Sequence, residues 1–236
     1  MRNLCVGALF SFLLSVPTAW SKPRYTDEQI EKAREATVAS PQDPAGFVEL
    51  GKLLLRKYEA TENKQFHHQS MVALEKAVSL DSKSAQALVY RGLLDCVRAR
   101  EDKSKDLARE GLKLMDQARE LEPENTGVAY LQGSVCIEVP KGWNRRDEGI
   151  QRLEAVAKSL EQDPTKAETY DFDLAEVHYK IAKAYRDRRE YDTATVHWQK
   201  VIELAPDSDE AERSRRYIDK FSVSQRPGIG WSGPGH

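Results

Sequence analysis

The sequence predicts an all-α fold: an α-solenoid of antiparallel helix pairs, with about three long repeats of 41 residues, one standard repeat of 34 residues and helical caps. The first observation is a constant step of 41 or 42 residues between turn residues, namely Pro41, Ser82, Pro123, Pro164 and Pro206. The second is that three glycines keep the same step, namely Gly51, Gly92 and Gly133. The third is that each unit holds two segments with apolar residues at helical spacing. A period in this range indicates stacked copies of one supersecondary unit.

The elements can be followed from the N-terminus. Thr26 and Gln29 have the spacing of a capping box, which predicts a helix that ends near Ala39 and forms half a repeat. Three long repeats follow, and each carries about seven extra residues between its two helices, in the ranges 58–65, 98–105 and 139–146. Insertions of this kind usually lie on one face of a solenoid, so we expect three inserted loops there.

The last repeat and its flanks complete the domain. A further extension, residues 165–174, contains Tyr170 and Phe172 and is therefore expected to pack locally. After Pro206, a charged helix is expected to close the stack and to end near Phe221. Terminal helices with a polar outer face protect the ends of such stacks from solvent and from association.

The final repeat carries a recognisable pattern. Residues 175–206 read AEVHYKIAKAYRDRREYDTATVHWQKVIELAP, with small residues at Ala182 and Ala194, a large one at Trp198 and a turn proline at Pro206. This pattern resembles a tetratricopeptide repeat (TPR), and weaker copies extend the resemblance over residues 25–221. The resemblance implies a non-catalytic module that binds a protein or peptide partner in a concave groove lined by the first helix of each repeat.

The resemblance also places candidate groove residues. With Gly51, Gly92, Gly133 and Ala182 as equivalent positions, the residues expected to face the partner are Val48, Lys52, Arg56, Val89, Leu93, Tyr130, Ser134, Tyr179, Lys183 and Arg186. Aliphatic, tyrosine and basic residues suit an extended or helical peptide. Val48 and Lys52 stand where the carboxylate-clamp members of the family carry lysine and asparagine, which argues against a co-chaperone of that type.

The N-terminus predicts export. One basic residue, Arg2, precedes an apolar run from Leu4 to Val16, and Ala19 and Ser21 have the spacing of a signal-peptidase site. The run is shorter than the ~20 residues needed to span a bilayer. We therefore expect a periplasmic or extracellular protein with no stable membrane insertion after the signal peptide is cleaved.

These observations divide the chain into three parts. Residues 1–21 are the expected signal peptide, residues 22–221 the repeat domain, and residues 222–236 a flexible tail rich in glycine and proline.

Composition and motifs narrow the function. The formal net charge is −2, with 31% charged residues, so no basic surface indicates a nucleic-acid partner. The sequence has no glycine-rich phosphate loop, paired-cysteine metal motif or HExxH motif, so we expect no cofactor, no metal and no enzymatic activity.

Two groups of residues leave alternatives open. Cys96 and Cys136 fall at near-equivalent places in successive repeats, which makes them either a disulfide pair or two buried thiols. A cluster in the third inserted stretch, formed by Lys141, Trp143, Arg145 and Arg146, is a candidate contact for an anion or a peptide. The alternative is that Trp143 is an apolar packing residue for the following helix.

Two other functions are compatible with the same sequence. The chain could be an accessory subunit of an exported enzyme complex, which it would contact through the inserted loops. It could also be a homo-oligomeric scaffold, since repeat stacks readily present surfaces to copies of themselves.

Overall fold

The computed structural model describes residues 25–224, and within this range the chain is helical without strands. The helices are α1 (Asp27–Ala39), α2 (Pro44–Thr61), α3 (Lys64–Leu80), α4 (Ala85–Asp102), α5 (Lys105–Leu121), α6 (Thr126–Glu138), α7 (Arg146–Gln162), α8 (Leu174–Asp187), α9 (Tyr191–Leu204) and α10 (Asp209–Ser224). Two short 3₁₀ helices, η1 (Lys141–Trp143) and η2 (Pro164–Tyr170), lie before and after α7.

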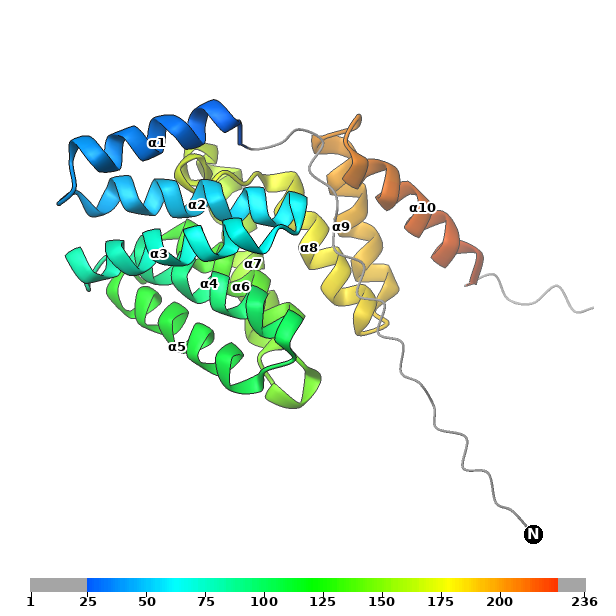
Figure 1. The fold of residues 1–236 in the computed structure, drawn as a ribbon. Helices are drawn as coiled ribbons and strands as arrows, with labels where there is room; N and C mark the ends of the chain where they lie inside the picture. The colour runs from blue at the N-terminus through cyan, green and yellow to red at the C-terminus, as the bar shows by residue number, and fades with distance from the viewer. Residues whose placement is uncertain (1–24, 225–236) are drawn as a thin grey trace, which may run out of the picture.

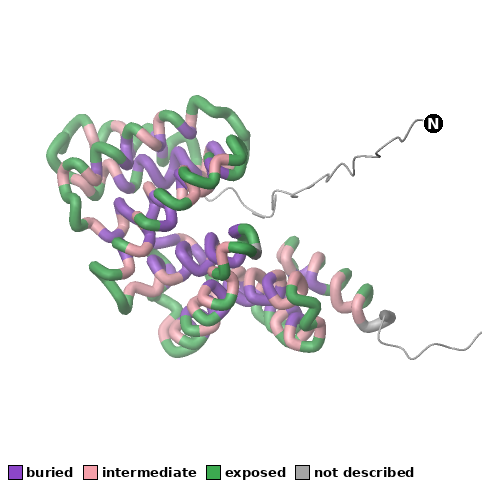
Figure 2. The backbone as a smooth tube through the Cα atoms, turned by 90° about the horizontal axis from the view of Figure 1, so that it is seen from below, coloured by how far each residue is buried: buried purple, intermediate pink, exposed green. Residues whose placement is uncertain are grey.

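The helices stack in chain order as antiparallel pairs. The four pairs are α2–α3, α4–α5, α6–α7 and α8–α9, and α1 and α10 lie at opposite ends of the stack (Figure 1). Buried residues follow the helix faces that meet inside the stack, whereas exposed residues gather at the turns and outer faces (Figure 2). The α-solenoid predicted from the 41-residue period is confirmed.

Side-chain caps fix where most helices begin. Thr26 and Gln29 form the predicted capping box: the Thr26 N–H donates to Gln29 Oε1 at 2.7 Å, and the Gln29 N–H donates to Thr26 Oγ1 at 3.1 Å. Before α2, α4 and α6 the capping side chains are Asp43, Ser84 and Asn125, and each accepts a backbone N–H of the first turn. These bonds satisfy donors that a helix start leaves without partners.

The prediction of inserted loops is wrong for the first two long repeats. Residues 58–65 and 98–105 lengthen the helices instead: α2 and α4 have 18 residues, α3 and α5 have 17, and α8 and α9 of the standard repeat have 14. Each helix thus gains about one turn, and only two residues join each long pair. Both stretches lack proline and glycine, so nothing in them interrupts a helix.

The third long repeat does contain a loop. Helix α6 ends at Glu138, just before Pro140, and the chain then passes through η1 before α7 begins at Arg146. Proline has no N–H to donate and restricts the residue before it, which accounts for the end of α6 here.

Glycines bring the two helices of a repeat into backbone contact. A methyl group at Gly92 of α4 would overlap the carbonyl oxygen of Gly111 of α5, and one at Gly149 of α7 would lie 2.9 Å from the carbonyl oxygen of Gly133 of α6. In the first repeat, the Ser70 hydroxyl of α3 donates to the Gly51 carbonyl at 2.7 Å. The sequence period in glycine is therefore a period of close helix crossings.

The C-terminal cap is held by aromatic packing. Trp198 of α9 is fully buried and stacks on Tyr217 and Phe221 of α10, with ring centroids 5.0 and 5.8 Å apart. Helix α10 extends to Ser224, beyond its expected end at Phe221, so residues 222–224 belong to the helix and not to the tail.

The rest of the expected tail and the expected signal peptide lie outside the described residues. Among residues 25–224, no helix combines the length and the apolar character needed to cross a bilayer.

We predict that Gly92→Ala destabilises the fold. Alanine favours a helix over glycine by about 1 kcal/mol, but its methyl group must displace the Gly111 backbone, and overpacking of this kind costs about 1–3 kcal/mol. The free energy of unfolding, measured in urea, should therefore fall by up to about 2 kcal/mol. The control is Gly46→Ala, whose methyl group meets only ordinary contacts at 3.7 Å, and it should leave stability unchanged or raise it. Equal stability of the two variants would contradict the close crossing.

Candidate functional site

The first helices of the repeats share one face, and a groove with a cavity of about 180 Å³ lies along it. The groove is lined by α2, α4, α6 and α8 and by the end of η2, with these residues on its surface: Lys52, Leu55, Arg56, Tyr58, Glu59, Glu62, Tyr90, Leu93, Val97, Arg100, Glu101, Tyr130, Leu131, Ser134, Val135, Glu138, Tyr170, Asp171, Glu176 and Lys180. The lining helices are those that the sequence indicated.

Half of the predicted groove residues lie on this surface, namely Lys52, Arg56, Leu93, Tyr130 and Ser134. In α2 and α4, the lining positions one and five residues after the periodic glycine follow the predicted register. The register holds because successive first helices are stacked in nearly the same rotation about their axes.

Val48 and Val89 were placed wrongly. Their exposed fractions are 2% and 0%, and both belong to the main apolar core instead of the groove surface. A position three residues before a glycine lies on the same helix face as the position one after it, but in α2 and α4 it is covered by the neighbouring helices.

The fourth repeat departs from the predicted strip. Tyr179 packs against the cluster of Ala182, Ala194 and Trp198, and Arg186 lies 5.1 Å from the Tyr217 ring of α10. Lys183 does not line the groove but pairs with the lining residue Glu138, whose carboxylate is 3.4 Å from its ammonium. None of the three residues lines the groove, so the predicted strip does not continue through α8.

Several groove residues were not predicted from the sequence, among them Glu59, Tyr90, Arg100 and Lys180. Glu59 and Arg100 lie eight residues after their periodic glycines, on the helical turn that we expected to be a loop. A helical spacing of three to four residues carried past the fifth position would have found them.

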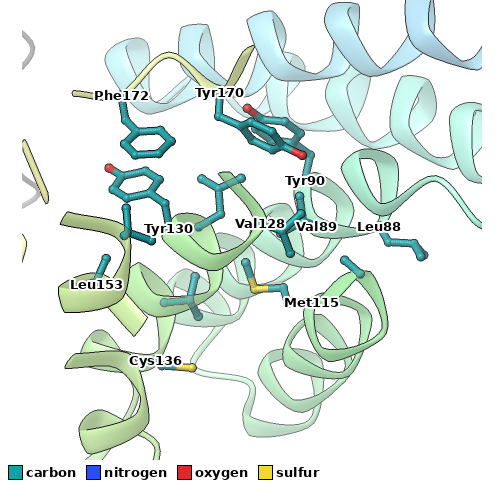
Figure 3. Packing of buried hydrophobic residues seen from close by; sticks show 14 of the residues in the cluster. Leu88, Val89, Tyr90, Met115, Val128, Tyr130, Cys136, Leu153, Tyr170 and Phe172 are labelled. Atoms are coloured by element: carbon teal, nitrogen blue, oxygen red, sulfur yellow. The ribbon is translucent and has the colours of Figure 1, made fainter. Parts of the chain in front are cut away.

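The groove is partly filled by the chain itself. The inserted segment, defined here as residues 164–173, joins α7 to α8 and crosses the first-helix face. The Phe172 ring stacks on Tyr130 of α6 at a centroid distance of 3.8 Å, and the Tyr170 ring stacks on Tyr90 of α4 at 5.9 Å (Figure 3). The expectation of local packing was therefore too narrow, because this segment contacts helices about 40 and 80 residues earlier.

Ionic contacts accompany the ring stacks. The Asp171 carboxylate lies 3.3 Å from Lys52 Nζ and 3.5 Å from Arg56 Nη2, both on α2. The same Arg56 guanidinium donates to the Tyr170 carbonyl at 3.2 Å. The side chains of Lys52 and Arg56 are only 7% and 11% exposed, so their charges need such partners.

Gly127 makes room for the Tyr170 ring. It lies in the first turn of α6, and a methyl group there would overlap the ring of Tyr170. Burial of the tyrosine raises the pKa of its phenol to about 12. A helical glycine placed under one aromatic ring is a specific accommodation for that ring.

The rest of the groove has an apolar floor and a charged rim. The floor is formed by Leu55, Leu93, Val97, Leu131 and Val135. Burial raises the pKa of Glu59, although Arg56, Lys180 and Arg100 oppose the change. Burial also disfavours the charge of Glu138, but Lys180, Lys183 and Arg100 outweigh it and hold its pKa below the usual range. Both signs of charge are therefore present on the rim.

The candidate loop contact is built mainly as internal structure. The Arg145 guanidinium donates to both carboxylate oxygens of Asp116 at 3.1 and 2.8 Å and pairs with Glu148. Trp143 is half-buried against the main core, with the Arg109 guanidinium 5.4 Å from its ring. Arg146 is half-buried as well, and Lys141 lies in η1. These contacts support the packing role for Trp143.

Cys96 and Cys136 are both free thiols in the structure. Burial raises the pKa of Cys96 to about 12 and also raises that of Cys136, so neither is a reactive thiolate near neutral pH. Of the two alternatives, the structure has buried thiols and no disulfide.

The described residues contain no cluster of three or more histidine, cysteine or carboxylate side chains that could hold a metal ion. Two histidines of the last repeat, His178 of α8 and His197 of α9, have Nδ1 atoms 3.0 Å apart. Burial lowers the pKa of both, that of His197 to about 4. The pair is a neutral packing contact inside the last repeat.

Comparison with solved structures identifies the fold. A thermophilic TPR protein of Thermus thermophilus, TTC0263, superposes with a TM-score of 0.62 at 16% identity, over 80% of this chain and 88% of that chain. Human IFIT1, solved as a dimer with PPP-AAAA, superposes with a TM-score of 0.55 at 14% identity, over 83% of this chain and 49% of that chain. No family model and no curated protein matches the sequence. The chain therefore has a TPR-like fold.

We predict that the histidine pair makes stability depend on pH. The folded pKa of His197 lies below its unfolded value of about 6.5, so its contribution is complete above pH 6.5 and is lost as the pH falls towards 4. Since His197 is half-buried, we expect a loss of about 1–2 kcal/mol in the free energy of unfolding. Urea unfolding at several pH values should show a weaker pH dependence for His197→Gln, while His68→Gln on the exposed side of α3 should match the wild type. An unchanged slope in His197→Gln would contradict the assignment.

We also predict that Gly127→Ala loosens the inserted segment. The added methyl group overlaps the Tyr170 ring, so the ring must leave its place over α6. Hydrogen–deuterium exchange of residues 165–173 should then become at least about tenfold faster, while α4 and α6 stay protected. Gly142→Ala is the control, because its methyl group meets no atom within 4 Å. Equal exchange rates in both variants would contradict the prediction, because they would show that the Tyr170 ring and α6 can accommodate the added methyl group.

Proposed function

We propose that this chain is an exported, non-catalytic binding protein that holds a protein or peptide partner in the first-helix groove. The observation that carries the proposal is the open part of the groove: an apolar floor contributed by three successive repeats, between rims that carry both signs of charge. Such a surface can bury apolar side chains of a partner and align its polar groups at the edges.

The fold supports an interaction role in general. TPR-like folds generally mediate protein–protein interaction, and no catalytic family is indicated for this chain. Export is proposed from the N-terminal sequence alone, that is, from the apolar run followed by Ala19 and Ser21.

The geometry gives less support to an interface made of inserted loops. Two of the three expected loops are helical extensions, and the third holds its arginine and tryptophan in internal contacts. Self-association through the groove is a distinct outcome of the experiment below.

We predict that a photo-crosslinking amino acid at Leu93 captures the partner in the native compartment, whereas one at Val72 does not. Leu93 is half-buried on the groove floor, and Val72 is 53% exposed on the outer helix α3. Mass spectrometry of the crosslinks distinguishes a foreign partner from a second copy of the chain.

The captured partner is then tested for groove specificity. Ser134→Trp, which places a large ring in the groove, should weaken its binding by at least about tenfold in calorimetry, and Val72→Trp should leave affinity unchanged. Thermal melting confirms that both variants fold. If a foreign partner binds both variants equally, or crosslinks only through the 139–146 loop, the groove is not the interface. Crosslinks to the chain itself alone would instead assign the groove to self-association.

A further inference from the structure

The inserted segment stands outside the repeat pattern. Four residues join successive units at 40–43, 81–84, 122–125 and 205–208, whereas eleven residues, 163–173, join α7 to α8. A junction of four residues is thus sufficient to pass from one unit to the next. The additional residues form η2 and then cross the groove, where Tyr170 and Phe172 join the main apolar core.

The contacts of this segment have the character of peptide recognition. Two rings, Tyr170 and Phe172, each stack on a groove tyrosine, and the Asp171 carboxylate between them meets two cations of α2. A main-chain carbonyl is bound as well, by Arg56. Ring stacking, a charge pair and a bond to the main chain are together the kinds of contact by which grooves recognise peptides.

The cations explain why the occupant carries a carboxylate. Lys52 and Arg56 are almost fully buried, and removal of one member of a buried ion pair leaves a charge whose desolvation is costly. Glu49 also contacts Lys52, at 2.6 Å, but the Asp171 side chain is the carboxylate that lies near both cations. A neutral or basic occupant at this place would lose that compensation.

The segment is also placed so that it can be exchanged. The Asp171 side chain is 37% exposed, and its backbone has a left-handed φ of 53°, a conformation that aspartate adopts more readily than most residues. The open cavity begins directly beside Tyr170 and Asp171, so a second peptide could enter along the groove and meet the segment there.

We propose that the groove recognises peptides that turn at an acidic residue between two aromatic residues, and that the inserted segment is the chain's own copy of such a ligand, which a partner displaces. The proposal rests on the proposed function and specifies the chemistry of the partner. The aromatic residues of the partner stack on Tyr90 and Tyr130, and its carboxylate pairs with Lys52 and Arg56.

The test uses a fluorescein-labelled peptide with the chain's own residues 165–174, TKAETYDFDL, added to the full chain. In the variant Tyr170→Ser with Phe172→Ser, the internal copy has lost both anchors. Fluorescence anisotropy should show that this variant binds the peptide at least about tenfold more tightly than the wild type, because the internal competitor is weakened.

Two controls make the result specific. A peptide in which lysine replaces the central aspartate should bind at least about tenfold more weakly to the same variant. Adding Tyr130→Ala to the variant should likewise weaken binding of the unmodified peptide, whereas adding Val72→Ala on the outer face should not.

A second variant covers a failure to fold, because Tyr170 and Phe172 are buried. Asp171→Asn keeps both rings and removes only the carboxylate, and it should bind the peptide about threefold or more tightly than the wild type. If a folded variant, either the double one or Asp171→Asn alone, gains no affinity, the proposal is overturned. The proposed function has a separate readout. It stands if the partner crosslinked at Leu93 binds the wild-type chain and loses affinity for Ser134→Trp, and it fails if Ser134→Trp leaves that affinity unchanged.

Discussion

Backbone contact between the two helices of the second and third repeats determines how the middle of this molecule is built. Gly92 meets Gly111, and Gly133 meets Gly149, at distances that leave little room for a Cβ atom. Met115 and Leu153 are fully buried and pack directly against Gly92 and Gly133 within their own pairs. The first helices then fall into register along one face. The groove is a consequence of this register, since no single repeat contains it.

Helix length gives the groove its chemistry. In the first two long repeats, the extra turn of each first helix carries Glu59 and Arg100 beyond the point where a standard repeat would end. Both residues lie at the rim, where burial and neighbouring charges together shift the pKa values of the carboxylates of Glu59 and Glu138. The long repeats thus produce a deeper groove with a charged edge, and the short fourth repeat closes it by packing against the cap α10.

The sequence predicted the fold well and the site in part, for physical reasons that differ. Periodic glycines and turn residues report local and nearest-neighbour packing, which recurs in every repeat. Helix extension over 58–65 could not be separated from a loop by periodicity alone, although the absence of proline and glycine there favours the helix. Contacts such as Tyr170 with Tyr90 depend on where a non-repeating segment crosses the stack. Only the eleven-residue junction with its two aromatic residues indicated that something unusual happens there.

In a groove that already contains an acidic and aromatic segment of the same chain, a partner binds in competition with that segment. Lys52 and Arg56 are largely buried and share the Asp171 carboxylate, and although Glu49 also pairs with Lys52, loss of that shared carboxylate carries a desolvation cost, so the site favours exchange of one occupant for another. An internal segment is present at a high effective concentration, which lowers the apparent affinity of any competitor for the same contacts. A partner must therefore gain additional contacts elsewhere, and the apolar floor beside Leu93 and Leu131 is where the groove offers them. Selectivity then depends on both parts of the groove. The covered part requires a carboxylate between two aromatic rings, and the open part supplies the additional apolar contacts that make displacement of the segment favourable.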